Sequence, residues 1–233
     1  GFIKHLAILI PIIALLLIEP HFSASMLIIG IVSIMMIVAG TKFWHFLATG
    51  AVLGVPGIIA LIALEPYRLK RVITFLDPWK DSTGSGWQVI QSLYAIGSGG
   101  LFGVGLGESK QKYLYIPEPH NDFIFSILAE ELGFVGCVIV ILLFAIFIWR
   151  GILIAMKAPD MFGSLLATGI TALVAIQVII NVAVVTSSMP ATGMPLPFFS
   201  YRWNGTIYIT VWDGSIIKYF KSGSKIKKYN LKH

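Results

Sequence analysis

Five long apolar stretches, separated by short polar segments, constrain this chain more than any other feature. They cover approximately residues 2–18, 22–39, 43–64, 123–149 and 162–185, and a helix needs about 20 apolar residues to cross a bilayer core. Hydrophobic residues make up 57% of the chain and charged residues 12%, whereas a soluble domain carries about 25% charge. A water-soluble globule and a disordered chain are therefore excluded. We expect an all-α, polytopic membrane protein with about five transmembrane helices.

The charges of the short loops predict how these helices are oriented, because Lys and Arg mark cytoplasmic loops. Four such residues fall on one side, namely Lys4, Lys42, Arg150 and Lys157. The Glu19 turn and the uncharged residues 186–191 fall on the other side. The long loop of residues 65–121 is then extracellular.

The long loop carries six Lys and Arg residues against five Asp and Glu residues. Two interpretations stay open: the charges simply balance, or the cations bind an anionic ligand. Trp87, Ile90, Leu93 and Tyr94 recur at helical spacing, with Gln91 and other polar residues such as Ser92 between them. This pattern predicts a short amphipathic helix at the membrane surface, ended by the glycines of residues 97–100.

Three glycines alternate with other residues at positions 103, 105 and 107. The pattern lacks the spacing and the strand–helix context of a dinucleotide site. We interpret the segment as flexible loop backbone.

The segment Ile116–Phe125 concentrates ionisable residues directly before a long apolar stretch. Asp122 stands where the predicted helix leaves the loop, and two interpretations stay open. Asn121 or Asp122 could cap the helix N-terminus. Alternatively, Asp122 is a carboxylate at the outer membrane boundary, where partial desolvation raises its pKa towards that of a general base.

Helical geometry places Ser126, Ala129 and Gly133 on the face of Asp122, at 100° per residue. These small residues suit a groove or a tight helix contact. Glu130 and Glu131 are costly inside a membrane unless they face protein or water, and we favour structural ion pairing over catalysis for both. Cys137 lies in an apolar run and reads as a small buried hydrophobe.

Several motifs stand in the same order and spacing as in the SEDS family of bacterial cell-wall polymerases (FtsW, RodA, SpoVE), which this chain resembles over residues 1–201. The Pro-Glu-Pro segment before His120 is closest to the division and sporulation branch. The matching motifs are Arg68-Leu69-Lys70-Arg71-Val72, Asp77-Pro78-Trp79, the residues 86–92 and 103–107, Pro117-Glu118-Pro119-His120-Asn121-Asp122, Glu130-Glu131-Leu132-Gly133, and the residues 195–201.

The resemblance implies a ten-helix, multi-pass glycosyltransferase of the bacterial cytoplasmic membrane, acting in cell division, cell shape or sporulation. Such enzymes polymerise lipid II into peptidoglycan strands outside the membrane, beside a class B penicillin-binding protein and other divisome proteins. The family's essential carboxylate maps onto Asp122, which would take the proton of the acceptor hydroxyl while undecaprenyl diphosphate leaves. A lipid II flippase and a non-catalytic scaffold for the penicillin-binding protein are the alternatives.

The candidate substrate-binding residues come from the same motifs. Three are cations that could stabilise the leaving diphosphate, namely Arg68, Arg71 and Lys112, and the others are Gln91, Glu118 and Ser200. A divalent cation, Mg²⁺ or Mn²⁺, could share the task, although the sequence shows no dedicated metal-ligand set.

The two ends of the chain depart from the family pattern. Gly1 corresponds to the start of the family's fifth helix, so we expect a piece of a longer protein. Residues 202–233 hold seven of the 17 Lys and Arg residues, and nucleic-acid binding is not indicated for the rest. We interpret 202–233 as a non-family tail translated out of frame, since a one-nucleotide shift can restore an apolar tenth helix, and we expect the chain as given to be inactive.

Overall fold

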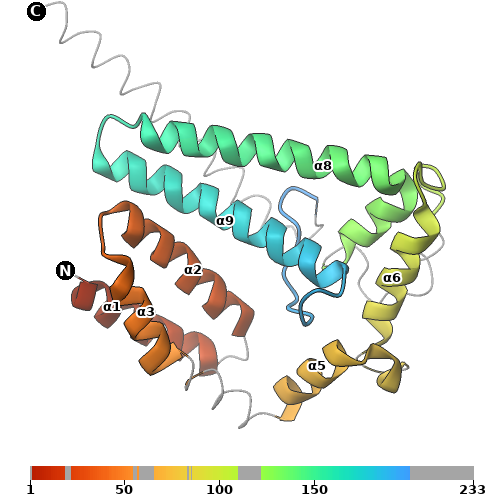
Figure 1. The fold of residues 1–233 in the computed structure, drawn as a ribbon, viewed down its shortest axis with the longest axis horizontal. Coiled ribbons are helices and arrows are strands. Elements are labelled where there is room, and N and C mark those ends of the chain that lie inside the picture. Colours follow the sequence, from red (N-terminus) through yellow and green to blue (C-terminus); the bar gives the residue numbers. More distant parts are fainter. Residues whose placement is uncertain are drawn as a thin grey trace, which may run out of the picture. The chain divides into compact units, whose positions relative to one another are not determined.

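The structure is a computed structural model that describes residues 2–18, 22–54, 57, 66–82, 84, 86–109 and 122–199. Within these residues the chain forms helices, turns and loops and contains no strand, so the all-α prediction is confirmed for this part. The elements are α1 (Phe2–Ile18), α2 (Phe22–Val38), α3 (Phe43–Thr49), η1 (Gly50–Gly54), α5 (Pro66–Leu76), η2 (Pro78–Asp81), α6 (Trp87–Gly99), α8 (Ile124–Met156) and α9 (Met161–Val185) (Figure 1).

The predicted apolar stretches correspond to α1, α2, α3, α8 and α9, with starts that differ by at most one residue. The third stretch is the least regular, because α3 ends at Thr49 and continues as the π-helix η1. Among the described residues, two helices are long and apolar enough to cross a membrane, Ile124–Met156 and Met161–Val185. The predicted number of five spans stays a prediction.

The chain divides into two compact units. In the first, formed by residues 2–42 and 144–176, α2 packs antiparallel to α9 through small residues. A Cβ atom at Gly30 would lie 3.1 Å from Ile176, and one at Gly169 would lie 3.0 Å from Met35. Gly151 of α8 likewise leaves room for Thr171 of α9. Glycines at these positions let apolar helices approach closely.

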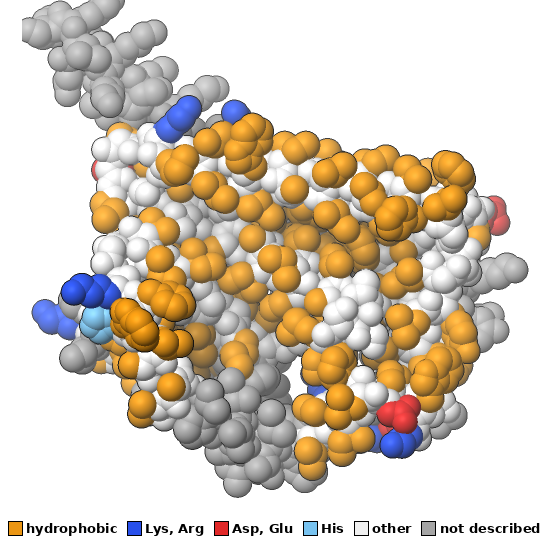
Figure 2. Space-filling view, viewed as in Figure 1, with side chains coloured by type: hydrophobic (Ala, Val, Ile, Leu, Met, Phe, Trp, Pro, Cys, Tyr) orange, Lys and Arg blue, Asp and Glu red, His pale blue; other side chains and the backbone are white. Residues whose placement is uncertain are grey.

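Exposed apolar side chains run along α8 from its middle to its end, as Figure 2 shows in orange. The segment Phe134–Met156 is about 35 Å long at 1.5 Å per residue, enough to cross a bilayer core. Lipid is the natural neighbour of such a surface. The exposed residues include Phe134, Ile139, Leu142, Leu143, Ile146 and Trp149.

The second unit, residues 43–143 and 177–199, contains the described part of the long loop. The predicted amphipathic helix is confirmed as α6, and Ile90 of its apolar face is buried, but Ser92 and Tyr94 have exchanged the predicted sides. Ser92 is completely buried and donates a hydrogen bond from its hydroxyl to the carbonyl of Val185 (3.0 Å), whereas Tyr94 is 53% exposed. The last carbonyls of a helix lack hydrogen-bond donors within the helix. Ser92 supplies such a donor to Val185, the last residue of α9.

α8 differs from the predicted helix in length and in continuity. It extends to Met156 rather than Trp149, and it is broken at Gly133, where φ is 68° and ψ is −169°. The break leaves carbonyls before Gly133 and amides after it without helical partners.

The glycine-rich segment of residues 100–105 supplies the missing partners. Val104 and Gly105 donate their backbone N–H groups to the carbonyls of Glu130 (3.0 Å) and Glu131 (3.1 Å). In return, Phe134 and Val135 donate to the carbonyls of residues 100 (2.9 Å) and 101 (3.1 Å). We call these four hydrogen bonds the backbone clasp. The segment is therefore a partner of α8 rather than the flexible loop that the sequence suggested.

We expect Gly133→Ala to lower the thermal unfolding temperature of the detergent-solubilised protein. A Cβ atom there would overlap the backbone nitrogen of Gly103 and lie 2.7 Å from the carbonyl of Leu101, and a non-glycine residue at positive φ adds strain of about 1–3 kcal/mol. The matched control is Gly97→Ala in α6, where a Cβ atom meets nothing within 4 Å. The control should unfold at the same temperature or slightly higher, and equal unfolding temperatures for the two variants would contradict the assignment of the clasp.

Candidate active site around Asp122

Asp122 lies two residues before the first helical residue of α8 and keeps part of its surface exposed. The residues that follow are packed away, since Phe123 and all residues of 125–130 are buried. Phe123 begins the helix by accepting hydrogen bonds from both the backbone N–H (3.0 Å) and the hydroxyl (2.7 Å) of Ser126. Asp122 is thus a partly accessible carboxylic acid at the edge of a packed core.

The backbone of Asp122 is held by a side chain from α9. The amide nitrogen of Asn181 donates one hydrogen bond to the carbonyl of Asp122 (2.9 Å) and one to the carbonyl of Met194 (2.8 Å). Asn181 is 1% exposed. One side chain therefore joins the start of α8 to the irregular segment that follows α9.

This irregular segment passes beside the carboxylate of Asp122. A Cβ atom at Gly193 would lie 3.5 Å from Oδ2 of Asp122, and Gly193 has a φ of +72°. The hydroxyl oxygen of the neighbouring Thr192 is buried, as is Oδ1 of Asp122. The backbone of Gly193 therefore lies directly beside the carboxylate, with no side chain at that position.

Arg71 of α5 holds the same segment from the other direction. Its Nη1 donates a hydrogen bond to the carbonyl of Ala191 (2.9 Å), two residues before Gly193. Arg71 also lines a cavity of about 270 Å³. The other lining residues are Thr74, Phe75, Gln88, Val89, Ser187, Met189, Pro190 and Ala191. Arg71 and Asp122 thus contact the same short stretch of backbone.

Glu130 lies in a very different environment from Asp122. It is 3% exposed, and its carboxylate accepts a hydrogen bond from the hydroxyl of Ser109. Its carbonyl belongs to the backbone clasp. This burial supports a structural role for Glu130, and its pairing with a cation stays a prediction. The predicted tight contact on the face of Asp122 is confirmed, because Gly99 of α6 packs directly on the backbone of Ala129.

The remaining sequence-predicted residues are only partly covered. Gln91 is buried in α6 at 6% exposure, and α6 lines the cavity beside Arg71 through Gln88 and Val89 instead. The side chain of Arg68 and the whole of Lys112, Glu118 and Ser200 lie outside the described residues. The tail of residues 202–233 also lies outside them.

A divalent cation finds no set of ligands in the part of the chain that the structure describes. Three or more His, Cys, Asp or Glu side chains do not come together there.

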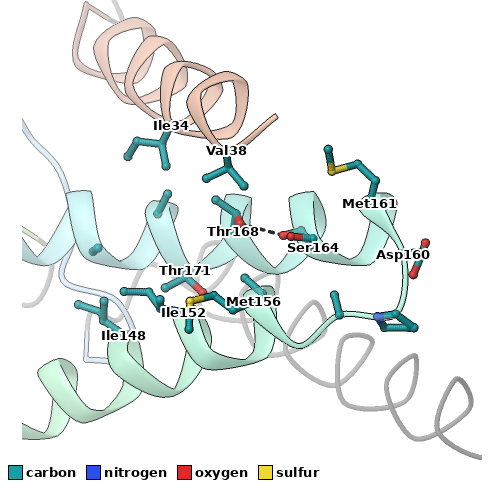
Figure 3. A pocket seen from close by; sticks show the side chains of 15 residues that line it. Ile34, Val38, Ile148, Ile152, Met156, Asp160, Met161, Ser164, Thr168 and Thr171 are labelled. Atoms are coloured by element: carbon teal, nitrogen blue, oxygen red, sulfur yellow. Dashed lines mark hydrogen bonds between the residues drawn. The ribbon is translucent and has the colours of Figure 1, made fainter. Parts of the chain in front are cut away.

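A larger cavity, of about 680 Å³, lies in the first unit (Figure 3). Its walls are mostly apolar side chains of α2, α8 and α9, such as Val38, Ile152 and Met161. In the cavity wall, the hydroxyl of Thr168 donates a hydrogen bond to the carbonyl of Ser164 (2.8 Å). The predicted orientation of the helices in the membrane, which placed Lys42 and Lys157 on the cytoplasmic side, stays a prediction. Chemistry is not indicated at this cavity.

The sequence reasoning missed Asn181 and the segment of Thr192 and Gly193. A signal was present for Asn181, because an amide side chain inside the apolar stretch 162–185 needs a hydrogen-bond partner. The sequence offered no way to name that partner, which lies 59 residues away.

The described part of the chain is that of a helical membrane protein with a partly exposed acid directly before a membrane-length helix. Comparison with known proteins identifies the family. Residues 1–218 match the family described as "Cell cycle protein", the FtsW/RodA/SpoVE family. The match extends past Tyr201, where the quoted motifs end. The chain belongs to this family.

Two curated relatives illustrate the similarity. "Stage V sporulation protein E" of Bacillus subtilis is 48% identical over 201 residues, which is 86% of this chain and 55% of the relative. "Probable peptidoglycan glycosyltransferase FtsW" of Trichlorobacter lovleyi is 43% identical over 226 residues, which is 97% of this chain and 59% of the relative. The chain thus spans little more than half the length of these relatives.

Two solved structures share the fold. A chain from a study titled "Structural coordination of polymerization and crosslinking by a peptidoglycan synthase complex" matches with a TM-score of 0.72 and 31% identity, over 89% of this chain and 58% of that one. A crystal structure of a mutant of rod shape determining protein RodA from Thermus thermophilus matches with a TM-score of 0.55 and 27% identity, over 90% of this chain and 52% of that one.

We expect Arg71→Gln to loosen the segment beside Asp122. Loss of a charge-assisted hydrogen bond costs about 1.5 kcal/mol, which corresponds to about tenfold faster local opening. Hydrogen–deuterium exchange on peptides covering residues 189–194 measures this change. The matched control is Lys70→Gln, because Lys70 is 59% exposed and pairs with Asp81 at 3.0 Å on the surface. Equal exchange rates in both variants would show that Arg71 does not hold the segment.

Proposed function

We propose that the protein containing this chain is a peptidoglycan glycosyltransferase of the bacterial cytoplasmic membrane that polymerises lipid II, with Asp122 as general base. The proposal rests on family membership together with one observation. In the segment 122–130, Asp122 is the acid that keeps partial exposure, whereas Glu130 is buried and hydrogen-bonded to Ser109.

The surroundings of Asp122 support this role. The described segment beside its carboxylate is neutral and glycine-containing, and the apolar residues that follow Asp122 limit its contact with water. A general base must be held in place and still be reachable by the proton that it takes. Asn181 fixes the backbone of Asp122, and Oδ2 lies beside Gly193, which has no side chain.

The reaction then proceeds by displacement at a sugar carbon. The 4-hydroxyl of the acceptor sugar gives its proton to the carboxylate of Asp122, and its oxygen forms a bond to the anomeric carbon of the growing strand. The bond from that carbon to the diphosphate oxygen breaks, and undecaprenyl diphosphate leaves with the electron pair. Both products remain attached to, or near, the membrane surface.

Cations assist such a departure by stabilising the charge that develops on the diphosphate. Arg68, Arg71 and Lys112 are the candidates from the long loop. Arg71 donates a hydrogen bond from Nη1 to the carbonyl of Ala191. We therefore assign to Arg71, as its main role, the positioning of the segment beside Asp122. Its positive charge adds to the local potential as well.

The complete gene product with Asp122→Asn should lose lipid II polymerisation by at least about a hundredfold, because the amide cannot accept the proton. Polymerisation of labelled lipid II by the purified, membrane-reconstituted protein measures the effect. Asp160→Asn is the matched control, since Asp160 is an exposed acid at the turn between α8 and α9 that accepts a hydrogen bond from Gly163 (3.4 Å).

Other outcomes separate the alternatives. Full polymerisation by the Asp122→Asn protein would overturn the general-base role. Normal septum formation in cells that carry only this variant would favour a scaffold for a class B penicillin-binding protein. Transport of lipid II across vesicles without polymerisation would favour a flippase.

A further inference from the structure

The structure places one buried amide in direct contact with the backbone of the proposed base. Asn181 donates both protons of its amide nitrogen, one to Asp122 and one to Met194, at 2.9 and 2.8 Å. An asparagine amide has two donor protons, so this donor capacity is fully used. Neither bond serves the helix in which Asn181 lies.

Both acceptors lie outside regular secondary structure. Asp122 precedes α8, and Met194 belongs to the segment that follows α9. A buried carbonyl without a secondary-structure partner must find another donor. Asn181 provides this donor to both sides of the site from a rigid helix.

The contact also restricts the backbone that carries the carboxylate. The carbonyl held by Asn181 and the carboxylate of Asp122 belong to the same residue, so a fixed carbonyl restricts the rotation of the backbone that carries the acid. Met194 is adjacent to Gly193, which lies beside Oδ2 of Asp122. A single amide therefore sets the acid and the backbone that faces it.

We propose that Asn181 is a positioning residue of the transfer reaction. It acts by holding Asp122 at a fixed position relative to the segment of Gly193 and Met194. This inference rests on the proposed function of Asp122. Catalytic groups must stay within about 0.5 Å of their productive geometry, and a misplacement of about 1 Å can cost a hundredfold in rate. Loss of the amide should consequently lower kcat and leave substrate binding intact.

The test compares Asn181→Leu with Gln177→Leu in the complete gene product, using lipid II as substrate. Leucine keeps the branched outline of asparagine but is larger and has no donor, and we expect kcat to fall at least about tenfold with KM changed less than about twofold. Gln177 lies one turn earlier on α9, is half-buried, and has a buried Oε1 without a hydrogen-bond partner among the described residues. Its replacement should leave both constants within about twofold.

A conservative variant separates positioning from simple packing. Asn181→Gln retains both amide protons on a longer side chain and should recover most of the kcat lost in the leucine variant. If Asn181→Leu is not recovered as a folded, monodisperse protein, Asn181→Ser replaces it in the same assay with the same expectation. An unchanged kcat in the leucine or serine variant, or an equal loss in the Gln177 control, would overturn the inference.

The two proposals fail in different ways. If Asp122→Asn is inactive and Asn181→Leu has normal kcat, the positioning role is wrong and the general base stands. If Asp122→Asn polymerises lipid II normally, the proposed function itself is wrong.

Discussion

The break in α8 at Gly133 is the constraint on which the second unit depends. A broken helix exposes backbone N–H and C=O groups, and such groups are costly in apolar surroundings unless they find partners. The backbone clasp satisfies two carbonyls before the break and two amides after it. Because these partners come from residues 100–105, the break also fixes where α6 ends and where the chain passes on towards Ser109.

The clasp explains why the first turns of α8 are buried all round, whereas the rest of the helix leaves one face exposed. Residues 125–130 are buried against the neighbouring loop and α6, whereas many apolar side chains from Phe134 onward are exposed. An acid within the buried part must be satisfied internally, as Glu130 is by Ser109. An acid just outside it, at residue 122, keeps part of its surface exposed.

The candidate site is a carboxylate whose surroundings are held by two helices. Asn181 from α9 and Arg71 from α5 hold carbonyls of non-helical segments, so two helices determine the position of the chain on both sides of the carboxylate of Asp122. Sites supported by helices are more precise than sites built on free loops. Such precision is what the proposed role of Asp122 would require.

Part of the site could be predicted from the residues alone. Asp122 stood out because it directly precedes a long apolar stretch, but that position also fits helix capping, and the role of base came from the resemblance of the surrounding motif to a known family. Arg71 was identified by its charge, but its bond to Ala191 required the fold. Asn181 and Gly193 were missed, since local patterns carry no information on pairs 59 or more residues apart, and Ser92 was placed on the wrong face for the same reason.

The sequence by itself determined the apolar helices, their starting residues to within one position and the family. Hydrophobic periodicity and segment length are local properties, so they can be recognised in the sequence alone. Only the tertiary structure decided that α8 is broken at Gly133, that a glycine-rich segment repairs the break, and that one buried amide holds the acid. Each of these depends on backbone groups finding partners far along the chain, and the need for such partners is a property of the folded environment rather than of any single segment.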